Sequence, residues 1–125
     1  AAEGDAQVTT ISAHIQARAY GASLLAPQLR PVWNLTALPS PLPNGDSALV
    51  EWRYGGVPTP PQTDTAPLKR TDTHECVPRT PEAQHQLRHF FKTGVVEQVC
   101  QDLPGGLCVK DRCPWDGWGK SDDDG

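Results

Sequence analysis

The chain has 125 residues, of which 37% are hydrophobic and 6% aromatic, and it carries 13 prolines, 11 glycines and a net charge of −4. An acidic chain without a basic face does not attract phosphate backbones, which argues against a nucleic-acid-binding protein. No apolar run approaches the roughly 18 residues needed to cross a bilayer. We therefore expect one small domain, residues 1–125, with a modest core and no transmembrane segment.

The start of the chain and its cysteines predict export. The chain has no methionine, begins with Ala1-Ala2-Glu3 and contains an even number of cysteines. Small residues at the start are typical of a chain from which a signal peptide has been removed. Paired cysteines are typical of oxidising compartments. We expect a secreted or periplasmic protein.

Residues 5–26 carry apolar side chains at helical spacing, which predicts a first amphipathic helix that is capped by Asp5 and ends at Pro27. The side chains expected to form its buried stripe are Val8, Ile11, Ile15, Ala22 and Leu25. A strand is the alternative, because residues 11–20 also alternate between apolar and polar side chains. Such a strand could complete the sheet of a neighbouring protein.

Two β-rich segments, residues 32–38 and 48–54, flank the turn signal Asn44-Gly45. This arrangement predicts a small antiparallel sheet. On the second strand Val50, Trp52 and Tyr54 share one face while Leu49, Glu51 and Arg53 share the other, so we expect one of the two sides to pack inward.

Residues 54–79 form a crossing that is rich in proline and threonine and has too little apolar surface to fold alone. Its natural state is extended backbone of the polyproline type. Within it, Pro58-Thr59-Pro60-Pro61 is either a plain surface connection or a peptide ligand for an aromatic groove.

The second predicted helix begins at Pro81, after Thr80 as its cap, and runs to about Gln101, with Gly94 as its weak point. Its expected buried stripe consists of Ala83, Leu87, Phe90, Phe91, Val95 and Val99.

The cysteines Cys76, Cys100, Cys108 and Cys113 are expected to form two disulfides. A continuous helix up to Cys100 would rise about 30 Å, whereas bonded cysteines need Cα atoms within about 7 Å. This excludes Cys76–Cys100 and leaves Cys76–Cys113 with Cys100–Cys108, or Cys76–Cys108 with Cys100–Cys113. If the helix breaks near Gly94, local pairing of Cys108 with Cys113 becomes the simplest choice.

Metal ligands are present in the sequence, but their order does not predict a site. His74, His85 and His89 lie near cysteines, yet no Cys-x-x-Cys knuckle accompanies them, and the spacing of His85 and His89 places both on the polar face of the second helix. The acidic tail, residues 114–125, lacks the spacing of a calcium loop. Its candidate ligands are Asp122, Asp123 and Asp124. We therefore predict no metal and no cofactor.

The same tail carries Trp115 and Trp118 among glycines. Two tryptophans in such a loop either cover a small core or anchor a partner protein. If the protein works by binding, we expect these rings to make the contact.

The sequence thus predicts an α+β fold with two amphipathic helices, a small antiparallel sheet and a disulfide-stabilised C-terminal loop. No catalytic motif is present, and we expect a non-catalytic binding or assembly protein that contacts another protein in the cell envelope or on the cell surface. The order of helix, sheet and disulfide loop is similar to the soluble part of a type IV pilin, without its hydrophobic N-terminal segment. That resemblance implies a pilus or other surface-filament subunit as one alternative. The other is a metal-binding protein or small enzyme built on His74, His85 and His89.

Overall fold

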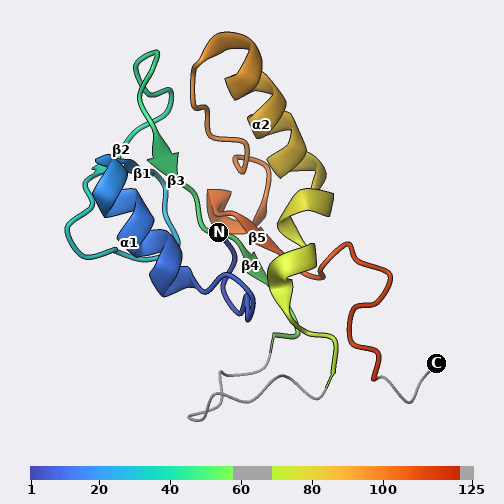
Figure 1. Cartoon of the computed structure of the whole chain (residues 1–125). Helices are drawn as coiled ribbons and strands as arrows, with labels where there is room; N and C mark the ends of the chain where they lie inside the picture. The colour runs from blue at the N-terminus through green and yellow to red at the C-terminus, as the bar shows by residue number, and fades with distance from the viewer. Residues whose placement is uncertain (58–68, 122–125) are drawn as a thin grey trace.

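The computed structural model describes residues 1–57 and 69–121 and mixes α and β structure (Figure 1). The predicted ligand motif at residues 58–61 lies outside the described residues. The elements are, in chain order, α1 (Thr10–Tyr20), β1 (Ser23–Leu25), β2 (Ala37–Leu38), β3 (Ala48–Leu49), β4 (Arg53–Tyr54), the 3-10 turns η1 (Thr73–Glu75) and η2 (Val77–Arg79), α2 (Pro81–Thr93), η3 (Pro104–Gly106) and β5 (Val109–Lys110). No helix among the described residues has the length and apolarity to cross a membrane.

The three-stranded sheet has the order β2-β1-β3, and both of its strand pairs are parallel. The predicted antiparallel pairing of residues 32–38 with 48–54 is therefore wrong, because β1 lies between those two segments. Asn44-Gly45 does form a turn, closed by a hydrogen bond from the Asp46 amide to the Pro43 carbonyl at 3.1 Å. This turn packs against the end of α2, where the Asn44 side chain donates to the Thr93 carbonyl at 2.7 Å, and it does not lead straight back into a hairpin.

The predicted first helix is divided into α1 and β1. Gly21 adopts the left-handed conformation with φ of 68°, and this ends α1 before β1 begins. Asp5 accepts hydrogen bonds from two amides in the turn that precedes α1, and does not cap the helix itself. Ile11 and Ile15 are 65% and 55% exposed, so the predicted stripe is wrong for them, and Val8 is exposed as well. The face of α1 that packs on the sheet carries the small side chain of Ala17.

The second helix begins at Pro81 as predicted but ends at Gly94, whose φ is 71°, and not near Gln101. Thr80 lies at the cap position, although its hydroxyl donates to the Cys76 carbonyl at 2.9 Å and not to an amide of the helix. Leu87 and Phe91 are 53% and 76% exposed, so their predicted burial is wrong. The chain beyond Gly94 turns back along the sheet and buries Val96.

The two sides of the sheet contact different parts of the chain. On one side, Leu24 and Leu49 pack against Ala17 of α1. On the other side, Ala48 and Val50 pack with a cluster that includes Leu25, Leu42, Val96 and Phe90. The sheet therefore lies between α1 and the α2 region, which is the arrangement visible in Figure 1.

A third cluster lies around the disulfides and the parallel pair of β4 and β5. Cys76 bonds to Cys113 and Cys100 bonds to Cys108, each with Cα atoms 5.1 Å apart. The cluster also contains the buried rings of Trp52, Tyr54 and Trp118. Burial in residues 48–54 is not confined to one face, as was predicted, because Leu49 and Glu51 of the other face are buried as well as Trp52 and Tyr54.

Candidate functional site

Two hollows, of about 400 Å³ and about 370 Å³, share part of their lining at β3. Both are lined by Ala1 and by residues 47–49. From here on, we call them together the central groove. Its α1 wall consists of Ala13, Gln16, Ala17 and Tyr20, and its α2 wall of Ala83, Gln86, Leu87 and Phe90. The groove runs between the two helices, and β3 forms its floor.

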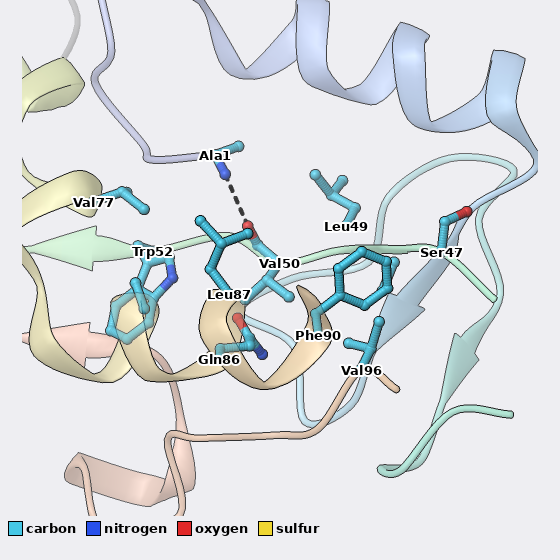
Figure 2. A pocket seen from close by; sticks show the side chains of 12 residues that line it. Ala1, Ser47, Leu49, Val50, Trp52, Val77, Gln86, Leu87, Phe90 and Val96 are labelled. Carbon is cyan, nitrogen blue, oxygen red and sulfur yellow. Dashed lines mark hydrogen bonds between the residues drawn. The ribbon is translucent and has the colours of Figure 1, made fainter. Parts of the chain in front are cut away.

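The α2 side of the groove is strongly apolar. Figure 2 shows Leu87 and Phe90 beside Val50 of the floor, with Val96 below Phe90. Gln86 is a polar residue of this wall, and its side-chain amide donates to the Glu97 carbonyl at 2.7 Å. Because that donor is already engaged, the surface offered to a ligand here is mainly hydrocarbon.

The floor of the groove also offers main-chain groups, because β3 is the outer strand of its sheet. The Ser23 amide donates to the Ser47 carbonyl at 3.0 Å, in the register that pairs Ser23 with Ala48. In a parallel ladder, alternate residues direct their amide and carbonyl groups to opposite sides. Ser47 and Leu49 therefore face β1, whereas the amide and carbonyl of Ala48 face the groove.

Further along, the same edge is occupied by the start of the chain. The Trp52 amide donates to the Ala1 carbonyl at 2.9 Å, and the Glu3 amide donates to the Trp52 carbonyl at 2.9 Å. The amino group of Ala1 donates to the Val50 carbonyl at 3.0 Å, as Figure 2 shows. Among residues 1–57 and 69–121, no segment pairs with this edge at Ala48.

A buried carboxylate fixes α1 above the floor. Glu51 is 6% exposed, and its carboxylate accepts a hydrogen bond from Arg30 Nε at 3.1 Å and is hydrogen-bonded to His14 Nε2 of α1. Burial by itself would raise the pKa of Glu51, but the bonds to Arg30 and His14 outweigh burial and lower it. This network connects α1 with the chain that follows β3.

The predicted partner-binding tryptophans lie at the third cluster, away from the groove lining. Trp118 is 8% exposed and belongs to the disulfide core, which matches the expectation that it covers the core. Trp115 is half-buried against the same core, and the guanidinium of Arg70 lies 6.0 Å from its ring centroid. A Cβ on Gly117 would lie 2.5 Å from the Trp115 ring, so that glycine is needed for the ring to pack. A partner contact through Trp115 stays a prediction.

The predicted metal ligands are dispersed among the described residues. His74 Nδ1 is hydrogen-bonded to Asp5 at 3.1 Å, and this bond raises the pKa of His74. His89 lies 3.3 Å from a Glu97 carboxylate oxygen, while His85 is exposed. All four cysteines are in disulfides. Residues 1–57 and 69–121 contain no group of three or more side chains placed to hold a metal ion, and Asp122, Asp123 and Asp124 lie outside them.

The groove was missed by sequence reasoning, because its lining comes from five segments that are far apart in the sequence: residues 1–8, residues 13–22, residues 47–52, residues 77–90 and Val96. One usable signal was present: Ala13 and Ala17 stand four residues apart, where small side chains allow a helix to approach a sheet closely. No family model, no curated protein and no solved structure matches this chain. Its function must therefore be argued from the groove itself.

Proposed function

We propose that the protein is a non-catalytic exported binding or assembly subunit that contacts another protein in the cell envelope or on the cell surface. The observation that supports this most directly is the central groove, whose α2 wall presents the half-exposed Leu87 beside Phe90. Exposed apolar surface in a concave site is typical of protein and ligand contact regions. The two disulfides fit an oxidising compartment.

To test this, peptides that bind the immobilised protein are selected from a phage library of random twelve-residue peptides. Enriched peptides should bind at least tenfold more weakly to Leu87→Asp, because a carboxylate in the groove would have to be desolvated by an apolar ligand. Phe91→Asp is the matched control, since Phe91 is on the same helix, is 76% exposed and does not line the groove. Failure to enrich peptides, or equal binding to both variants, would argue against the groove as the binding site.

The metal-binding or enzymatic alternative requires His74, His85 and His89 to act together. In the structure His74 bonds to Asp5, whereas His89 lies beside Glu97. Elemental analysis of purified protein tests this alternative directly. Stoichiometric zinc or copper would favour it over the binding function proposed above.

A further inference from the structure

We propose that the side of α1 that faces away from the sheet docks on an anionic lipid bilayer, at the level of the headgroups. We call this surface the outer α1 face, and it consists of Ile11, Ile15, Arg18 and Ala19 of α1 together with Trp33. None of these five residues lines the central groove. The inference therefore goes beyond the proposed contact with a partner protein.

The outer α1 face is one continuous surface. Ile11 and Ile15 are one helical turn apart, and Arg18 follows on the same side of the helix. The Arg18 guanidinium lies 5.3 Å from the centroid of the Trp33 ring and donates to the Trp33 carbonyl at 3.3 Å. Ile11, Ile15 and Trp33 are each more than half exposed. Large apolar side chains that are exposed side by side mark a contact region.

The helix α1 is apolar on two opposite sides. Its inner side packs the small residues Ala13 and Ala17 against the sheet, whereas the larger Ile11 and Ile15 lie on the outer side. A surface helix normally turns a polar face to water, and a helix that is apolar all round is normally covered all round. A second apolar phase against the outer side would complete the burial that the sheet begins.

The charges around α1 fit an anionic surface. Residues 6–45 contain two arginines and no aspartate or glutamate, so all 15 acidic residues lie elsewhere in the chain. Arg30 is paired with the Glu51 carboxylate. Arg18 contacts Trp33 and has no carboxylate partner among the described residues. A cation at the membrane surface is attracted to anionic headgroups, so Arg18 favours a bilayer that contains anionic lipid.

The side chains of the outer α1 face are also those that suit a membrane surface. Tryptophan rings settle at the headgroup level, and arginine places its charged end there while its hydrocarbon stem stays on apolar surface. Arg18 stacked on Trp33 meets both requirements at the rim of the face. Ile11 and Ile15 would then enter the boundary between headgroups and acyl chains, as the apolar side chains of a helix in the membrane plane do.

The size of the face favours lipid over a second copy of the chain. The 11 residues of α1 form a helix about 16 Å long and about 10 Å wide. Its footprint is several-fold smaller than the roughly 800 Å² per partner that stable protein interfaces bury. A bilayer closes around whatever apolar surface enters it, and the strength of binding follows that area together with the attraction between charges.

The test measures flotation of the whole protein with vesicles of equal parts phosphatidylcholine and phosphatidylglycerol at low salt. Ile15→Asp should bind at least tenfold more weakly, because its carboxylate would have to leave water and approach anionic headgroups. Phe91→Asp is the matched control and should bind like the wild type. It makes the same change of charge at an exposed ring of α2, on the other side of the sheet (Figure 1).

A second variant separates the charge from the apolar contact. Arg18→Gln should bind about fivefold more weakly to the mixed vesicles, which is the effect expected for one cation near an anionic surface. Its weaker binding to vesicles of phosphatidylcholine alone should equal that of the wild type. A loss of the same size on both kinds of vesicle would show that Arg18 does not act through its charge.

The fluorescence of Trp33 measures insertion directly. Trp33 is exposed, whereas Trp52 and Trp118 are buried and Trp115 is half-buried, so the acrylamide quenching that disappears in Trp33→Phe belongs to Trp33. Vesicles should lower this part of the quenching at least twofold, because the ring moves to the headgroup level. If the thermal midpoint shows that Ile15→Asp does not fold, this measurement on the wild-type protein decides.

Three results would overturn the inference: no binding to the mixed vesicles, equal loss in Ile15→Asp and Phe91→Asp, or quenching of Trp33 that vesicles do not change. A concentration-dependent dimer that Ile15→Asp abolishes would also overturn it, because a second copy would then cover the outer α1 face. None of these results concerns the central groove. The proposed function is tested separately, by the binding of selected peptides to Leu87→Asp.

Discussion

The two disulfides close loops of very different length, so removing them should destabilise the protein by different amounts. Cys76 and Cys113 are 37 residues apart, whereas Cys100 and Cys108 are 8 residues apart. In the chain-entropy model, loops of these lengths correspond to about 3.8 and about 2.5 kcal/mol at 25 °C. The difference, about 1.4 kcal/mol before the two values are rounded, depends only on the ratio of the loop lengths. It is a sizeable part of the net stability of a small domain.

The assay is equilibrium urea unfolding of two paired variants, Cys76→Ala with Cys113→Ala and Cys100→Ala with Cys108→Ala. The four cysteines are buried in the same cluster, so the packing lost in the two variants is similar. The first variant should have the lower free energy of unfolding and also the larger m-value, because its unfolded state gains more exposed surface. Equal losses, or a greater loss from the short loop, would refute the reasoning.

Further predictions concern single side chains. Trp118→Ala should lower the free energy of unfolding by about 3 kcal/mol because the ring is in the disulfide core, and urea unfolding would measure it. Phe91→Ala should change it by less than about 0.5 kcal/mol because that ring is exposed, and a loss above about 2 kcal/mol would show that the ring is packed. Glu51→Gln should lower the free energy of unfolding. This loss should be at its full size above pH 4.5, the ordinary pKa of the Glu51 carboxyl, and should become smaller as the pH falls through the lower pKa of that carboxyl in the folded state. Thermal midpoints of both proteins from pH 6 to pH 3 test this, and a constant difference would contradict it.

Local signals predicted the start of α2 correctly, but not the other three helix ends or the buried helix faces. The start of α2 followed from Thr80-Pro81, and the proposed weak point, Gly94, is where it ends. The buried face of α1 could not be read from periodicity because apolar side chains lie on both of its sides. In the structure, the small residue Ala17 packs against the sheet and Ile11 is exposed.

The sheet was predicted least well, because its pairing is decided by contacts far apart in sequence. The three residues of β1 were assigned to a helix, yet β1 occupies the centre of the sheet and makes both neighbouring strands parallel. The disulfides were predicted from a helix that reaches Cys100. In the structure α2 ends at Gly94, and the pairing of Cys108 with Cys113 expected in that case is wrong, because Cys76 bonds to Cys113 and Cys100 to Cys108. The pairing of β4 with β5, which starts one residue after Cys108, helps to hold the C-terminal loop in place.

The candidate site depends on strand register, which the sequence does not state. A slip of one residue along β1 would turn the Ala48 amide away from the groove and exchange the faces of Leu49 and Val50. Glu51 opposes such a slip, because its carboxylate must lie on the α1 side to reach His14 and Arg30. Moving it to the other side would bury a charge without those partners, which is strongly unfavourable. The same carboxylate that holds α1 against the sheet therefore also helps to fix the register of β3 against β1.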